Sequence, residues 1–113
     1  MRTGISLLAL ALSATAAITA NRFVTPAGAL AGAGVNAQGV AQTDAAIGAK
    51  VTATILGTEV VEAGAAIAAG ALVESDATGR AITHAAGVIL GRLAPGEVAT
   101  AAGQFVEIVL IPN

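Results

Sequence analysis

The stretch Leu72–Thr83, with the sequence LVESDATGRAIT, decides the fold because it places two short strand-forming segments on either side of a tight turn. The side chain of an Asp such as Asp76 can accept hydrogen bonds from the backbone amides that follow it, and Gly79 tolerates a positive φ. Residues 76–79 are therefore the clearest turn of the chain. The sequence predicts a tight β-hairpin with LVES and RAIT as its strands.

Short apolar segments between Gly-rich turns continue on both sides of this hairpin, over the whole chain beyond residue 20. Only Ala63–Ala69 favours a helical turn, and it is too short to be stable alone. The predicted fold is mainly β with little helix, a small β-barrel or sandwich of short strands in one domain of residues 21–113. The predicted strands are Arg22–Thr25, Gly39–Gln42, Lys50–Leu56, Glu59–Glu62, Ala71–Ser75, Arg80–Thr83, Val88–Leu93 and Gln104–Ile111.

A weak internal repeat relates the two halves of this domain. Phe23-Val24-Thr25 and Leu72-Val73-Glu74 each precede a Gly-rich turn, and each half ends on a longer apolar segment. Two similar β units, residues 21–57 and 70–111, would explain this order. Chance self-similarity of a chain rich in Ala, Gly and Val is the equal alternative.

The composition predicts a thin hydrophobic core. Hydrophobic residues make up 56% of the 113 residues, but alanine is the most frequent of them and only 2% of the chain is aromatic. Burial of a methyl-sized side chain gains about 0.8 kcal/mol, against roughly 1.5–3 kcal/mol for Leu or Ile. Small domains of this kind are commonly stabilised by disulfides, metal or association. Because the chain has no Cys and one His, the sequence favours association with itself or with a partner.

No constellation of residues points to catalysis or metal binding. His84 is the single histidine, and the acidic residues nearest to it in sequence are Asp76 and Glu97. Glu74 and Asp76 could project from one face as an acid pair, but the hairpin turn already explains the Asp. We therefore expect no enzymatic activity, no cofactor and no metal. The net charge of −2 and the absence of a basic patch predict no nucleic-acid binding.

Residues 1–20, MRTGISLLALALSATAAITA, allow several interpretations. A basic residue before an apolar stretch fits a secretory signal peptide, which would make the chain a secreted or periplasmic small β-domain. Leu8, Leu10, Leu12 and Ile18 instead recur with a period of two, which predicts a strand or an extended N-terminal arm. The abundance of Ala and Leu leaves an amphipathic helix as a further alternative. A membrane-spanning helix is not predicted, because the uncharged apolar run is shorter than the ~20 residues required.

The last predicted strand is apolar on both faces except at Glu107. One face can pack on the domain's own core and the other against a second subunit, whereas a central position in a closed barrel would cover both. Apolar residues of this strand, of the N-terminal segment and of the first domain strand form the candidate interface. They are Leu8, Leu10, Leu12, Ile18, Phe23, Phe105, Val109 and Ile111.

Four stretches carry a resemblance to a known family. They are TANRFVTPAGALAGAG (19–34), GVAQTDAAIGAKVTATILGT (39–58), VVEAGAAIAAGALVESDATGRAITHAAGV (60–88) and AAGQFVEIVLIPN (101–113). Their order and spacing resemble the small capsid cement, or head decoration, proteins of tailed bacteriophages. The resemblance spans residues 14–113, and its short motifs include Gly39-Val40-Ala41, Asp76-Ala77-Thr78-Gly79 and Gly103-Gln104-Phe105-Val106.

This resemblance implies a structural virion protein with a β-rich fold. It implies attachment to the outer surface of the capsid, with the major capsid protein as the partner, and stabilisation of the capsid lattice. Many cement proteins act as trimers at local three-fold positions, so a homotrimer is the expected oligomer. The resemblance also implies that the N-terminal segment is an ordered arm rather than a signal peptide.

Overall fold

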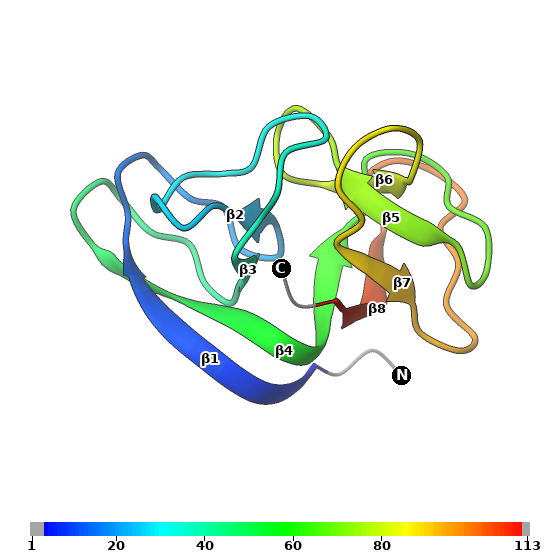
Figure 1. Cartoon of the computed structure of the whole chain (residues 1–113), viewed down its shortest axis with the longest axis horizontal. Helices are drawn as coiled ribbons and strands as arrows, with labels where there is room; N and C mark the ends of the chain where they lie inside the picture. Colours follow the sequence, from blue (N-terminus) through cyan, green and yellow to red (C-terminus); the bar gives the residue numbers. More distant parts are fainter. Residues whose placement is uncertain (1–3, 112–113) are drawn as a thin grey trace.

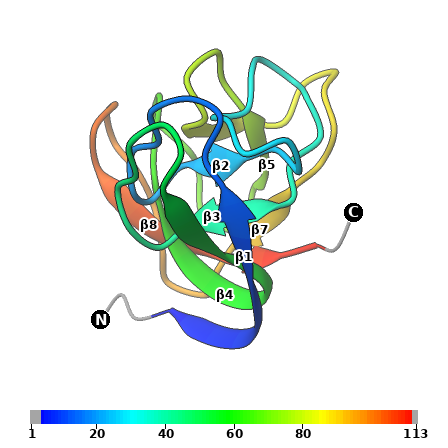
Figure 2. The same cartoon turned by 90° about the vertical axis from the view of Figure 1, so that its left-hand side faces the viewer.

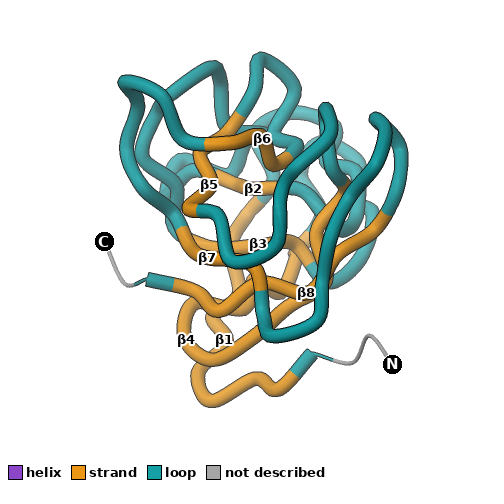
Figure 3. Tube along the Cα trace, turned by 90° about the vertical axis from the view of Figure 1, so that its right-hand side faces the viewer, coloured by secondary structure: helices purple, strands orange, loops and turns teal. Residues whose placement is uncertain are grey.

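Antiparallel strands joined by long loops make up the structure, a computed structural model that describes residues 4–111 (Figure 1). Within these residues every segment is either strand or loop, and no helix occurs (Figure 3). The prediction of a mainly β fold is confirmed. The strands are β1 (Ile5–Ser13), β2 (Phe23–Val24), β3 (Gly39–Ala41), β4 (Lys50–Glu62), β5 (Leu72–Ser75), β6 (Ala81–Thr83), β7 (Gly91–Leu93) and β8 (Phe105–Leu110).

The strands form one sheet that curls into a nearly closed barrel. Its order is β2-β3-β4-β8-β7-β5-β6, and β1 pairs with β4 beside this path. Ala63, which follows β4, bridges in parallel to Ala81 of β6. The far end of the sheet therefore returns to β4. The backbone amide of Phe23 adds a bond of 2.7 Å to the carbonyl of Gly79 in the β5–β6 turn.

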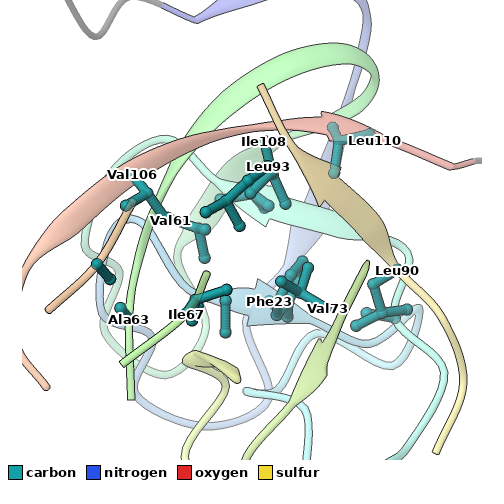
Figure 4. Close-up of a cluster of buried hydrophobic side chains, with 14 of the residues drawn as sticks. Phe23, Val61, Ala63, Ile67, Val73, Leu90, Leu93, Val106, Ile108 and Leu110 are labelled. Atoms are coloured by element: carbon teal, nitrogen blue, oxygen red, sulfur yellow. The ribbon is translucent and has the colours of Figure 1, made fainter. Parts of the chain in front are cut away.

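The main core fills this barrel (Figure 4). Val61 of β4, Val73 of β5, and Val106 and Ile108 of β8 are fully buried there, in the same cluster as Phe23. Because side chains alternate across a strand, the even-numbered residues of β8 point inward and leave the odd-numbered ones outside. The inward residues of this strand are apolar because they form the core. The core does not explain why the residues on its outer face are also apolar.

A second, smaller core lies beside the barrel, under β1 and the first half of β4. Leu12 of β1 packs against it, and the chain after β1 enters it with Ala14 and Ile18. Its buried members are Ala14, Ile18, Val24, Ala41, Val51 and Ala53. The N-terminal segment is therefore an extended strand, as its period of two predicts, and it is packed against the domain.

Strand β4 joins the two cores and bends at Gly57, whose φ is 107°. Its first half pairs with β1 on one edge and β3 on the other, and its last five residues pair with β8. A Cβ at residue 57 would collide with the carbonyl oxygen of Ile5, so both the backbone angle and the close approach of β1 require glycine. The sequence predicts two strands separated at Gly57-Thr58, whereas the structure has one bent strand.

Two further predictions are wrong in detail. Ala63–Ala69 forms no helical turn, because Ala63 and Ile67 make bridges to Ala81 and Ala99, which are distant in sequence. The seventh strand begins at Gly91 rather than at Val88, because the amide of Val88 donates to the carbonyl of Gly34 in a neighbouring loop, over 3.1 Å.

The hairpin of β5 and β6 has the predicted geometry. One carboxylate oxygen of Asp76 accepts the backbone amides of Thr78 and Arg80, each over 2.9 Å. Gly79 has a φ of 82°. The turn is thus closed by its own Asp side chain, as its sequence indicates.

The β4–β8 pair divides the sheet into two halves, β2-β3-β4 on one side and β8-β7-β5 on the other. Gly39 in β3 lies against the carbonyl of Thr54, and Gly91 in β7 lies against the carbonyl of Val109. In both halves a glycine thus allows the middle strand to approach the long strand next to it. This likeness supports two similar β units, which stays a prediction.

Asn21 holds β2 and β3 against β4 in a conformation that few side chains tolerate. Its φ is 62°, in the left-handed region that favours Gly and Asn. Its amide donates to Ala41, its carbonyl accepts the amide of Glu62, both over 2.8 Å, and its Nδ2 donates to the carbonyl of Val60 over 2.9 Å.

Asn21→Ala should lower the free energy of unfolding by about 1–3 kcal/mol, because it adds strain at positive φ and removes the side-chain hydrogen bond. Asn21→Gly should cost less, because glycine adopts this φ without strain. Urea unfolding followed by circular dichroism measures both. Equal losses for the two variants would show that the backbone angle contributes nothing.

Candidate interaction surface

The carboxylates of the β5–β6 region are engaged by their own loops. Glu74 is buried, and one of its carboxylate oxygens accepts the amides of Ala85 and Gly87 over 2.7 and 2.9 Å. These two hydrogen bonds lower the pKa of Glu74 despite its burial, and His84 contributes in the same direction. The His84 ring nitrogen Nε2 lies 2.9 Å from the carbonyl oxygen of Gly87. This carboxylate therefore orders the loop after β6.

Glu74→Gln should lower the melting temperature at pH 7 by roughly 5 °C, because a neutral amide accepts the two loop hydrogen bonds less strongly. A carboxylate with a lowered pKa contributes stability above its unfolded pKa, about 4.3 for Glu, and this contribution is lost as the pH falls through the folded value. The difference between parent and variant should therefore shrink from pH 7 to pH 3. Thermal melts by circular dichroism at both values test this, and a gap independent of pH would contradict it.

Ion pairs connect residues next to β2, at the end of β4 and in the β5–β6 turn. Glu62 at the end of β4 lies 3.2 Å from Nη2 of Arg22 and 3.6 Å from Nη1 of Arg80. Nε of Arg80 lies 3.2 Å from Asp76. Burial raises the pKa of Asp76, but the amides of Thr78 and Arg80 outweigh it and leave that pKa lowered. These charges bind one another and link the start of β2 to the hairpin turn.

Residues 4–111 contain no group of three or more His, Cys, Asp or Glu side chains that could hold a metal ion. No helix long and apolar enough to cross a membrane occurs among these residues. Because the acidic and basic side chains described above have partners within the fold, the exposed apolar residues are the more informative surface.

The first component of this surface is β1, which is exposed over almost its whole length. Within the described chain it pairs only with β4, so one of its edges has no strand partner (Figure 2). Leu8 lies opposite Leu56 of β4, and both are exposed. Leu10 is 41% exposed, whereas Leu12 is partly covered by the second core.

The second component is the outer face of β8. Phe105 and Val109 are each 42% exposed, and Ile111 just beyond the strand is also exposed. Thr58 of β4 is the register partner of both Ile5 and Val109. The two components therefore meet along β4. We call the exposed residues Ile5, Leu7, Leu8, Leu10, Leu56, Phe105, Val109 and Ile111 the β1–β8 surface.

Two of the predicted interface residues lie elsewhere. Ile18 is 3% exposed in the second core and Phe23 is 1% exposed in the main core. Ile18 turns inward because the chain leaves the β1 direction after Ser13, and Phe23 is the largest fully buried side chain of the domain. Neither can contact a partner in this structure, so both are corrected from interface to core.

Sequence reasoning missed Ile5, Leu7 and Leu56, which are exposed in the same region. The period of two selected only the even-numbered residues of the first strand. The structure has register irregularities between Ser6 and Leu8 and between Leu8 and Ala9, so alternation alone could not assign the odd-numbered residues. The continuous apolar run was the signal that could have included them.

The family of the chain follows from comparison with known proteins. Residues 1–110 match the family described as phage cement proteins. The chain belongs to the phage cement protein family. It is thus a structural protein of the phage virion, associated with the outer surface of the capsid, as the sequence resemblance predicted.

The fold of this cement protein is shared with a solved structure. The N base of the head fiber protein gp8.5 of bacteriophage phi29 is similar with a TM-score of 0.76 and 22% identity, over 92% of this chain and 93% of that chain. No curated protein sequence matches the cement protein. The alternative of a secreted domain would require cleavage to remove β1, a strand that pairs with β4 from Ile5 to Ser13.

Proposed function

We propose that this cement protein binds the outer face of the assembled phage head through the β1–β8 surface and stabilises the lattice of the major capsid protein. The observation that carries the proposal is the exposure of this apolar surface on a member of a cement family. Isolated exposed apolar residues are common, but contiguous groups of them mark interaction sites.

The chemistry of the surface supports a protein partner. Apart from Glu107, which accepts a hydrogen bond from Thr58 over 2.7 Å, the residues of β1 and β8 are uncharged. Cores of protein interfaces are depleted in charged side chains and enriched in apolar and aromatic ones. Phe105 is the exposed one of the two phenylalanines, and aromatic residues are enriched in the cores of interfaces, so we expect it to contact the partner.

Stabilisation follows from mass action. A protein that binds only the assembled shell stabilises it by RT ln(1 + [L]/Kd) per site, about 2.7 kcal/mol when its concentration is a hundred times Kd. Such a contribution is repeated at every occupied site of the head. Disassembly must remove the bound cement protein first, so the shell resists heat and internal pressure.

We propose a homotrimer at local three-fold positions as the bound form. The support is the resemblance to trimeric cement proteins and the thin core, which favours association. The mass of the particle in solution, measured by light scattering after gel filtration, tests this. A monomer at all concentrations would contradict a trimer that forms before it binds the head.

Heating purified empty heads with and without saturating cement protein tests the stabilisation. We expect decorated heads to release capsid protein at a higher temperature, by an amount that grows with cement concentration until the sites are filled. Equal release temperatures at full occupancy would contradict the stabilising role while leaving the binding intact.

A further inference from the structure

The free edge of β1 has a self-complementary sequence. Leu8-Ala9-Leu10-Ala11-Leu12 is the same in both directions, and the segment has no charge and no proline. Leu8 and Ala9 are consecutive, but their partners Leu56 and Thr54 are two residues apart. The extra residue at this shift of register therefore belongs to β4. The alternation of β1 therefore continues without a break through the palindrome.

The backbone groups of Ala9 and Ala11 face this free edge. The amide of Ala14 donates to the carbonyl of Ala49, and the carbonyl of Ala14 accepts the amide of Gly48, both over 2.8 Å. Ala14 thus faces the β4 side. Because backbone groups alternate between the two edges of a strand, residues 10 and 12 face β4 as well, and residues 9 and 11 point away from it.

The open part of the edge has a defined end. Beyond Ala11, the amide of Thr15 donates to the carbonyl of Gly28 over 2.9 Å, and its hydroxyl donates to Ala27 over 3.0 Å. Gly28 also lies against the carbonyl of Ser13. This loop covers the last part of the strand and leaves the palindrome as the uncovered segment.

We propose that the β1 strands of two copies of this protein pair antiparallel along these free edges, across a two-fold axis that passes between the two Leu10 residues. Ala9 of one copy and Ala11 of the other then exchange both backbone hydrogen bonds. The two-fold axis generates the same exchange between Ala11 of the first copy and Ala9 of the second. This pairing satisfies edge groups that otherwise have no strand partner.

The side chains fit the same register. Leu10 lies opposite its own symmetry mate, and Leu8 lies opposite Leu12 of the second copy. Opposite residues share a face, so all leucines of the palindrome form one continuous apolar ladder. No like charges meet across the axis, which is the usual obstacle to an isologous strand pair.

The pairing goes beyond the proposed function, because it is a contact between cement protein copies rather than with the capsid. It is compatible with a trimer, since neighbouring three-fold positions of an icosahedral lattice are related by local two-fold axes. Strand pairs of this kind would connect neighbouring cement units into a net over the head.

Single-cysteine variants test the register, because the natural chain has no Cys. In the proposed pair, the two residues at position 10 form a non-hydrogen-bonded pair with Cα atoms about 4.5 Å apart, which lies within the range for a disulfide. Leu10→Cys should therefore be oxidised to a covalent dimer. Leu8→Cys is the matched control, because the two residues at position 8 lie roughly 13 Å apart in the pair and should not cross-link. An equimolar mixture of Leu8→Cys and Leu12→Cys should cross-link, because these two positions lie opposite each other. Failure of Leu10→Cys, or equal cross-linking of Leu8→Cys alone, would overturn the proposal.

Charge variants provide a second test that does not depend on oxidation. Leu10→Lys and Leu10→Glu each place like charges across the axis and should weaken association in sedimentation velocity at least tenfold, whereas their equimolar mixture should recover it. A mixture that associates no better than its components would overturn the pairing. Head binding is measured separately on the unmodified protein, so failure of the strand pair and failure of the cement function give different results.

Discussion

Phe23→Ala is expected to lower the free energy of unfolding by about 3–5 kcal/mol, whereas Phe105→Ala should lower it by less than about 1 kcal/mol. Phe23 is 1% exposed in the main core, and Phe105 is 42% exposed on β8. Removal of the first ring leaves a cavity among valines and leucines, whereas solvent can fill much of the space that the second ring occupies. For a domain whose total stability is of the order of 5–15 kcal/mol, the first variant loses a large share of it.

Urea unfolding followed by far-ultraviolet circular dichroism measures both phenylalanine variants, since the chain has no Trp or Tyr to report by fluorescence. The two substitutions remove the same atoms, so each serves as the control for the other. Similar losses of stability would show that the two rings have similar surroundings, against the structure. Head binding should respond in the opposite order among folded molecules, with Phe105→Ala the weaker binder.

The combined change Leu8→Lys and Val109→Lys should weaken head binding at least about thirtyfold, the effect of losing roughly 2 kcal/mol at an interface centre. Both side chains are exposed, so the lysines remain hydrated in the free protein and its melting temperature should change little. On the head, the same lysines would have to be desolvated in an apolar contact.

Ile47 and Val98 supply the matched control for this double variant. Both are exposed apolar residues, and they lie in the β3–β4 and β7–β8 loops outside the β1–β8 surface. Ile47→Lys with Val98→Lys adds the same charge and should leave head binding within about twofold. Equal weakening by both double variants would mean that total charge, and not this surface, governs binding. Deletion of residues 2–18 is a less informative test, because it also removes Ala14 and Ile18 from the second core.

Local sequence rules predicted those parts of the fold that local interactions determine. The β5–β6 hairpin follows from the hydrogen bonds of Asp76 and the positive φ of Gly79, which involve residues next to one another in sequence. Gly57 shows the limit of such rules. A glycine between two apolar segments indicates a turn, but here it bends a continuous strand because β1, distant in sequence, lies against it.

The candidate interface was predictable to the extent that alternation determines exposure. Phe105 and Val109 were selected because the last strand is apolar on both faces, and the structure places them outside the barrel. Ile18 and Phe23 were selected as apolar residues of the N-terminal region, and no local pattern shows that they close two separate cores. Whether a large apolar side chain is a core or an interface residue depends on long-range packing, which a single sequence does not reveal.

The most direct test of the cement function is cosedimentation of the purified protein with expanded empty heads and, separately, with unassembled major capsid protein. Selective affinity for the assembled shell is what makes binding stabilise it. We predict saturable binding to the heads, little binding to the unassembled protein, and loss of head binding in the Leu8→Lys, Val109→Lys variant. Absence of the parent protein from the head pellet, or equal binding to unassembled capsid protein, would contradict the account.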